Sequence, residues 1–336
     1  MTPQNRDYIQ LTVVDDTSKD KNFSGRSTPL PSKLNPLSEP SSTSDFLTPI
    51  SICINVCSSV GIVLCNKFVF DKYDFKFGTA LTVIHFLVTF LGLEVCARLG
   101  FFEKKTIRIK EVLGLCVSFC GFVVLTNLSL QHNTVGFYQM AKVLTTPCIA
   151  ILQTVFYQKT FSTSIKLSLA VICFGVGIAS VTDVSLNWVG TFFALAGVLV
   201  TSLYQIWIGT KQKSLGVNSW QLLYYQAPIS SLMLLCVVPI IDDLPGLMNY
   251  SYNIQNVSAI LFTGLLAFLV NLSIFMIIGK TSPITYNVVG HFKTCLILVL
   301  GFFIFNYPVD IINISGIIIA LIGIFSYSKY TMKNPK

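Results

Sequence analysis

Charged residues are scarce in this chain of 336 residues. Asp, Glu, Lys and Arg make up 11% of the sequence, whereas a typical soluble domain has about 25%. Apolar residues make up 53%, and the mean hydropathy is +0.69. This composition excludes an ordinary soluble domain and predicts a polytopic membrane protein embedded in a lipid bilayer. The formal net charge of +8 is explained by basic residues in short segments between apolar runs, where they act as topology signals.

The sequence also lacks the groupings that enzymes and metal sites require. Its three histidines, His85, His132 and His291, are scattered and form no metal-binding spacing. There is no phosphate-binding loop for ATP, and no pair of carboxylates lies within an apolar run. All ten cysteines fall inside apolar runs, as expected for small packing residues. We therefore predict a protein without cofactor or metal that is not an enzyme.

Long apolar runs are abundant, and about 20 such residues suffice to cross a bilayer as a helix. The sequence predicts an all-α membrane protein with ten transmembrane helices. The predicted spans are 47–70, 78–99, 110–130, 134–157, 164–182, 187–210, 219–241, 255–279, 283–306 and 310–330. Residues 1–46 are rich in Ser, Thr, Pro, Asn and Asp and predict a disordered cytosolic tail. Residues 331–336 form a short cytosolic C-terminal tail in this scheme.

Basic residues alternate between the predicted loops. If the N-terminus is cytosolic, the cytosolic loops and C-terminus hold thirteen Lys and Arg residues, whereas the opposite loops hold only Lys72 and Lys76. This positive-inside bias supports ten spans with both termini in the cytosol. On the opposite side, Asn249 lies in an Asn-x-Ser pattern and is the candidate glycosylation site.

The chain contains signs of an internal repeat. Asn127-Leu-Ser recurs as Asn271-Leu-Ser, and a Thr stands eight residues before both Lys142 and Lys293. We expect two five-helix halves, residues 47–183 and 184–330. Because five is odd, the second half is inverted relative to the first, an arrangement typical of transporters with a site at the membrane midplane.

Lys142 and Lys293 are the two cations that the span assignment places deep in the bilayer. Neither has a nearby acidic residue in the sequence. A charged side chain at this depth costs several kcal/mol and is a functional-site hypothesis, and an anionic ligand such as phosphate is the natural partner. The alternative is a structural lysine that reaches the interface or stays neutral. The one deep carboxylate, Glu94, is expected to pair with Arg98 one turn later.

Aromatic and amide side chains accompany the two lysines and are candidates to stack on a base or bind sugar hydroxyls. Helix–helix hydrogen bonds and interfacial aromatics are the alternative explanation for each of them. These candidates are Tyr138, Gln139, Tyr225, Gln226, Tyr286 and Asn287.

Several separated motifs carry a resemblance to a known family. FYQMAKVLTTP, YQKTFST, LGVNSWQLLYYQAP and NLSIFMIIGKTSPITYNVVGHFKTC occur in this order, before the ending GIIIALIGIFSYS. Over about residues 47–330 the chain resembles the nucleotide-sugar and triose-phosphate translocator family, with the closest likeness to subfamily E of solute carrier family 35 and to plant UDP-sugar transporters. The resemblance implies the drug/metabolite transporter fold of two inverted five-helix repeats, with alternating access around a central cavity.

The resemblance also implies roles for individual residues. Lys142 and Lys293 would hold the phosphates of the substrate, and Thr294 after the second lysine is similar to the Lys-Thr pattern of a UDP-sugar branch. Plastid sugar-phosphate translocators look like Lys-Arg at this position. Without that arginine, bidentate phosphate capture is weaker.

The sequence therefore predicts an antiporter in the Golgi membrane, with the ER as the alternative. It would exchange a nucleotide sugar, with a UDP-sugar as the expected substrate, for a nucleoside monophosphate such as UMP. The alternatives are a sugar-phosphate/phosphate exchanger and a non-transporting scaffold of the same fold. No nucleic-acid partner is expected. The oligomeric state stays open, with a homodimer as one alternative.

Overall fold

The computed structural model of the chain describes residues 43–132, 141–180, 187–305 and 311–333. Within these ranges all regular secondary structure is helical. Most of the predicted disordered tail, 1–46, lies outside the described residues, and the first helix begins at Thr43. The helices are α1 (Thr43–Tyr73), α2 (Gly78–Arg98), α3 (Ile109–His132), α5 (Thr145–Tyr157), α6 (Thr163–Ser180), α7 (Trp188–Leu215), α8 (Ser219–Ile241), α9 (Leu244–Met248), α10 (Ile254–Lys280), α11 (Pro283–Phe305) and α12 (Ile311–Lys333).

The predicted spans coincide with helices wherever the structure describes them. Residues 134–140 of the predicted fourth span lie outside the described part, and the remainder forms an apolar helix over Ala141–Tyr157. Seven helices in the described residues are long and apolar enough to cross a membrane, and Ala141–Tyr157 and Thr163–Ile178 are shorter apolar helices. The structure therefore supports a helical multi-pass membrane protein. The short helix α9 was not predicted and lies in the loop between α8 and α10.

Local sequence explains where several helices begin and end. Asn187, Asn218 and Asn253 precede α7, α8 and α10, and each side chain accepts hydrogen bonds from backbone N–H groups of the first turn. Gly216 ends α7 in the left-handed region at φ 58°, where a residue without a Cβ is favoured.

Helix α2 takes its N-terminal cap from another part of the chain. Its flanking residue Phe77 provides no side-chain hydrogen bond. Instead, the carboxylate of Asp242, directly after α8, accepts from the backbone N–H of Thr79 at 3.2 Å and of Ala80 at 2.7 Å. The cap therefore joins the end of α8 to the start of α2.

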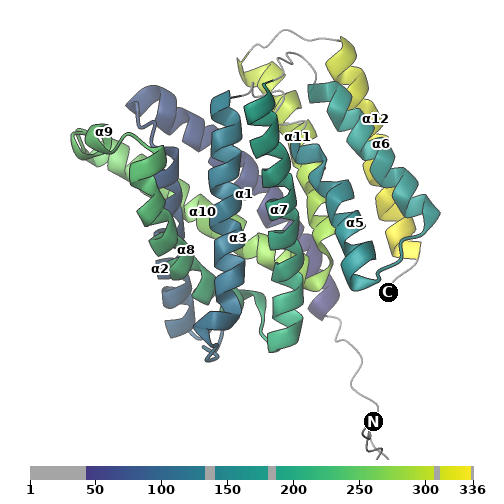
Figure 1. Cartoon of the computed structure of the whole chain (residues 1–336), viewed down its shortest axis with the longest axis horizontal. Helices are drawn as coiled ribbons and strands as arrows, with labels where there is room; N and C mark the ends of the chain where they lie inside the picture. Colours follow the sequence, from purple (N-terminus) through teal and green to yellow (C-terminus); the bar gives the residue numbers. More distant parts are fainter. Residues whose placement is uncertain (1–42, 133–140, 181–186, 306–310, 334–336) are drawn as a thin grey trace, which may run out of the picture. The chain divides into compact units, whose positions relative to one another are not determined.

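The helices pack around two main apolar cores. One core joins buried residues of α2, α3, α7, α8 and α10, and the second joins residues of α5, α6, α7, α11 and α12. In Figure 1, α6 and α12 run side by side, and these two helices are in closer contact than any other described pair. A Cβ on Gly175 of α6 would lie 2.3 Å from the backbone nitrogen of Ala320 on α12. Small residues thus let these helices approach closely, as is common in membrane proteins.

Candidate functional site

Lys293 lies in α11 and is almost completely buried, with 9% of its surface exposed. Its Nζ donates hydrogen bonds to Asn55 Oδ1 at 2.8 Å and to Ser59 Oγ at 3.2 Å, both on α1. The same Nζ lies 5.2 Å from the ring centroid of Tyr286, two turns earlier in α11, a distance typical of a cation–π contact. Within the described residues, this ammonium therefore contacts neutral groups and an aromatic face.

The acceptor of Lys293 is itself fixed by a third helix. Asn55 is fully buried, and its Nδ2 donates to Ser273 Oγ on α10 at 2.8 Å. Ser273 in turn donates to the backbone carbonyl of Leu269 at 2.7 Å. This series of bonds sets the amide so that its oxygen faces Lys293. An ammonium carries three N–H donors, and within the described residues two of them are used by α1.

Lys142 lies in the helical turn that begins at Ala141, just before α5. It borders a small cavity of about 50 Å³ between α3, α5 and α7, whose polar lining residues include Ser129, Thr145 and Thr201. Helix α5, which follows Lys142, is in contact with α11, which carries Lys293. The structure therefore packs the helices of the two lysines predicted from the sequence against each other.

The remaining predicted site residues have varied surroundings. Tyr138 and Gln139 lie outside the described residues. Thr294 donates its hydroxyl to the backbone carbonyl of Gly290 at 3.1 Å, within its own helix. The ring of Tyr225 packs edge-on against Tyr224 at 5.7 Å between centroids.

Two predicted amides make hydrogen bonds between helices. Gln226 of α8 donates to the hydroxyl of Tyr204 on α7 at 2.9 Å, and its Oε1 is buried with no hydrogen-bond partner. Asn287 of α11 donates to Gln205 Oε1 on α7 and to the carbonyl of Pro283 at 2.9 Å. Both contacts fit the alternative explanation of helix–helix bonding, so a role in ligand binding stays a prediction for these residues.

The structure adds residues that the sequence did not single out. Asn55 and Ser59 are the direct partners of Lys293, and their only sequence signal is that they are polar residues in a long apolar run. His291 was dismissed as scattered, yet it is buried and its Nε2 lies 2.7 Å from Thr146 Oγ1. This contact joins α5 and α11, the two helices next to the deep lysines.

Glu94 forms the expected pair with Arg98 at 3.0 Å. It also accepts from Lys104 Nζ at 2.6 Å and from the hydroxyl of Tyr224 at 2.8 Å. The hydrogen bond to Glu94 raises the pKa of Lys104, which lies in the loop after α2. This carboxylate thus bonds α2, the following loop and α8 together, and it is separate from the Lys293 contacts.

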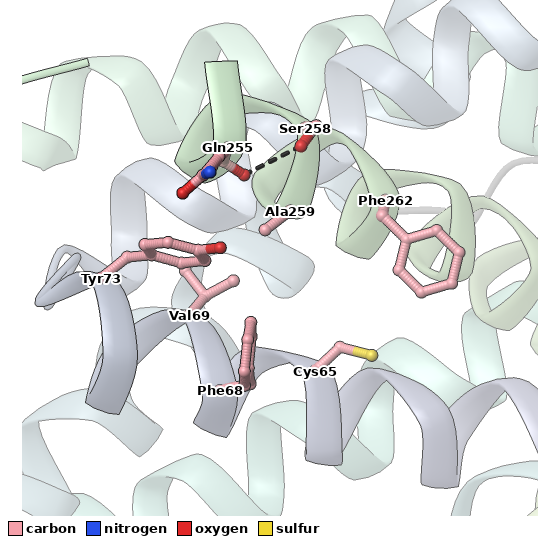
Figure 2. A pocket seen from close by; sticks show the side chains of 8 residues that line it. All are labelled: Cys65, Phe68, Val69, Tyr73, Gln255, Ser258, Ala259 and Phe262. Carbon is pink, nitrogen blue, oxygen red and sulfur yellow. Dashed lines mark hydrogen bonds between the residues drawn. The ribbon is translucent and has the colours of Figure 1, made fainter. Parts of the chain in front are cut away.

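A lateral groove of about 410 Å³ lies between α1 and α10, and none of the predicted ligand-binding residues lines it. Figure 2 shows Phe68 and Tyr73 of α1 facing Gln255 and Phe262 of α10 across this groove. The candidate glycosylation residue, Asn249, is exposed directly after α9. Among the described residues, no group of three or more His, Cys, Asp and Glu side chains could hold a metal ion.

Together, the apolar helices define a multi-pass membrane protein, and Lys293 is a buried basic residue of α11. The sequence profile of the triose-phosphate transporter family matches residues 52–328. The chain is 42% identical over 283 residues to UDP-xylose transporter 3 of Arabidopsis thaliana, covering 83% of this chain and 79% of that protein. It is 36% identical over 280 residues to UDP-rhamnose/UDP-galactose transporter 2 of the same plant, covering 82% and 80%. The chain belongs to the triose-phosphate transporter family.

This membership confirms the resemblance drawn from the motifs, and it identifies a family of transporters rather than enzymes. A solved crystal structure also shares the fold, with a TM-score of 0.69 over 87% of this chain and 99% of the other at 10% sequence identity. That likeness concerns the fold alone.

Proposed function

We propose that this protein is an antiporter that exchanges a nucleotide sugar for a nucleoside monophosphate across the Golgi membrane. A UDP-sugar is the substrate that the relatives favour, since their names specify UDP-xylose, UDP-rhamnose and UDP-galactose. The observation that carries the proposal is the buried ammonium of Lys293, which is held by neutral acceptors and lies on α11, a helix that packs against α5, the helix after Lys142. In this proposal Lys142 and Lys293 bind the phosphates of both exchanged ligands.

The neutral partners of Lys293 suit a site that must bind and release an anion. A carboxylate partner would compensate the charge and compete with the phosphate. Asn55 and Ser59 stabilise the ammonium by hydrogen bonds and leave its full charge for the ligand. Thr294 supplies no second cation, and this favours a nucleotide sugar over the small sugar phosphates that a Lys-Arg pair would capture.

The proposed architecture is ten transmembrane helices in two inverted repeats, residues 47–183 and 184–330. The helix contacts support this pairing if α1, α2, α3, α5 and α6 correspond to α7, α8, α10, α11 and α12. If each helix is replaced by its counterpart in the other half, a contact within the structure should correspond to a second contact. The contact α3–α7 corresponds to α10–α1, α2–α10 corresponds to α8–α3, and α5–α7 corresponds to α11–α1. All six contacts are present. Three helices also contact their own counterparts in the other half, namely in the pairs α2–α8, α5–α11 and α6–α12.

This relation explains how one site could face each side of the membrane in turn. The two halves place their lysines on corresponding helices, α11 and the helix that contains α5. An anion bound between the two lysines attracts both positive charges. In the empty site the two like charges repel each other in a region of low dielectric constant. Reorientation with a bound ligand is then favoured over reorientation of the empty site, which gives exchange. The loops rich in Lys and Arg, and both termini, face the cytosol.

The test is exchange by purified protein in proteoliposomes preloaded with UMP, CMP, GMP or inorganic phosphate. Labelled UDP-xylose, UDP-rhamnose, UDP-galactose, GDP-mannose and a sugar phosphate are offered outside. The expected result is uptake of a UDP-sugar that depends on internal UMP. Uptake of the sugar phosphate with internal phosphate would assign the chain to sugar-phosphate exchange. No uptake by folded protein under any loading would favour a scaffold.

A further inference from the structure

A second cavity, separate from Lys293, lies where α5 and α7 end and α10 turns into α11. Its volume is about 590 Å³. Its inner wall consists of apolar residues of α7 and α10 and of Gln153 on α5, and lysines and hydroxyl groups lie around it. It contains none of the residues that the sequence singled out for ligand binding. The proposed topology places this end of the helices at the cytosolic surface.

The polar groups of this cavity favour an anion. Lys159 follows α5 and Lys213 lies in the last turn of α7, and no carboxylate is among the described lining residues. Thr210, Ser214 and Thr281 add hydroxyl groups. Ammonium and hydroxyl donors without a competing carboxylate are a suitable environment for a phosphate group.

Helix α11 contributes its positive end to the same cavity. Ser282 and Pro283, at the start of this 23-residue helix, are both lining residues. The helix dipole favours an anion at this end. The Ser282 hydroxyl already accepts from the backbone N–H of Thr285 at 3.1 Å, which fixes the geometry of the turn.

Gln153 brings an unsatisfied polar atom to the wall of this cavity. It is only 7% exposed, and its Oε1 is buried without a hydrogen-bond partner in the described structure. An unpaired buried acceptor is costly, and native proteins rarely keep one without a function. A rotation of the Gln153 amide would turn this oxygen toward the cavity, where a hydroxyl group of a bound ligand would satisfy it. The cavity therefore offers cations for a phosphate and an acceptor for a hydroxyl.

A polar contact between α7 and α11 borders this cavity. Asn287 and Gln205 are hydrogen-bonded to each other just inside the lining residues Ile206 and Pro283. Lys293 is six positions further along α11, about 9 Å at 1.5 Å per residue. A ligand in the cavity would thus be one helical layer away from the buried lysine.

We propose that this cavity is a docking site on the cytosolic face for a phosphate-bearing, hydroxyl-rich ligand, namely the nucleotide sugar before it reaches Lys142 and Lys293. The identity of the ligand rests on the proposed antiport function, whereas the existence of a separate phosphate site does not. Lys159 and Lys213 bind the phosphates, and Gln153 accepts from a hydroxyl group. Parting of Asn287 from Gln205 then opens the way inward.

The existence of the site is tested by binding of UDP to purified, delipidated protein in a neutral detergent, with thermal stability as the readout. In a Lys293→Gln variant, UDP should still raise the melting temperature, because the cavity is intact. The additional changes Lys159→Gln and Lys213→Gln should abolish this rise, whereas Lys110→Gln and Lys166→Gln, which remove two exposed lysines outside the cavity, should not. Loss of all UDP stabilisation in Lys293→Gln alone would overturn the proposal.

The role in transport is tested with proteoliposomes sorted by orientation. In the otherwise unchanged protein, Lys159→Gln with Lys213→Gln should raise the KM for the UDP-sugar about two- to thirtyfold from the cavity side, while kcat and the KM from the other side stay unchanged. An equal change on both sides would contradict a one-sided docking site. If wild-type protein transports nothing but UDP still binds as predicted, the antiport function fails and the phosphate site stands.

Two further measurements concern the inner wall and the source of the phosphate. Gln153→Leu should raise the same KM without lowering the melting temperature, because it removes an unpaired acceptor; a lower melting temperature with an unchanged KM would indicate a purely structural role. The second measurement is binding of a phosphoinositide to the purified protein. If the phosphoinositide binds, UDP does not, and the Lys159→Gln and Lys213→Gln variant loses this binding, the ligand of the cavity is a lipid headgroup. That result would overturn the assignment to a soluble substrate.

Discussion

Replacement of Lys293 by glutamine is the most direct test of the central site. The change removes the buried charge but keeps a side chain that can hydrogen-bond to Asn55. A hydrogen bond to a charged group contributes about 1.5–3 kcal/mol, and 1.36 kcal/mol corresponds to a factor of ten. We therefore expect UDP-sugar uptake at low substrate concentration to fall about 10- to 150-fold. The fold should persist, because removal of a buried charge takes away a desolvation cost.

The assay is initial uptake by proteoliposomes at substrate concentrations well below the KM. Lys329→Gln, which removes an exposed lysine of α12, is the matched control and should behave as wild type. Uptake by Asn55→Ala should lie between that of Lys293→Gln and that of the control, since this change leaves the charge but removes the 2.8 Å bond that positions it. A cost of about 0.5–1.5 kcal/mol corresponds to a fall in uptake of about two- to twelvefold. Wild-type uptake by Lys293→Gln would refute the assignment of this lysine to the substrate.

Three further predictions concern stability and topology. Gly175→Val should destabilise the protein by about 1–3 kcal/mol, seen as a lower melting temperature in detergent, because its Cβ would collide with the backbone of Ala320; an unchanged melting temperature would show that α6 and α12 can separate at no cost. Asp242→Ala should cost about 0.5–2 kcal/mol through loss of the α2 cap, whereas Asp243→Ala should cost less, because the Asp243 side chain makes no cap hydrogen bond to α9. Asn249→Gln should remove a glycan-dependent gel shift of protein expressed in eukaryotic cells, and absence of any shift in wild type would contradict a lumenal loop.

The helices could be predicted from the sequence because a single local property determines them. A run of about 20 apolar residues becomes a helix in a bilayer, since every backbone polar group must be satisfied within the segment. The boundaries at Ser219 and Pro283 agree with the predictions because an Asn cap and a proline mark them. Helix α9 escaped prediction because its five residues have no periodic pattern to detect.

The site could be predicted only in part. Lys293 is visible in the sequence as a charge where none is expected, but its partner Asn55 is 238 positions away, and nothing local in the chain relates the two. The same holds for His291 and Thr146, which are 145 positions apart. Interhelical contacts of this kind depend on how the helices pack, and a single sequence does not contain that arrangement in any local pattern.

In the proposed site, the partners of Lys293 allow this lysine to remain in the membrane and still bind a ligand. A lone ammonium at this depth would cost several kcal/mol, and a carboxylate would remove that cost by cancelling the charge. The amide of Asn55, held by Ser273, and the hydroxyl of Ser59 stabilise the ammonium with their dipoles but do not neutralise its charge. The remaining electrostatic cost is relieved only when an anion arrives. Replacement of Ser59 by Asp would reverse this balance, and we expect it to stabilise the empty protein while it abolishes exchange.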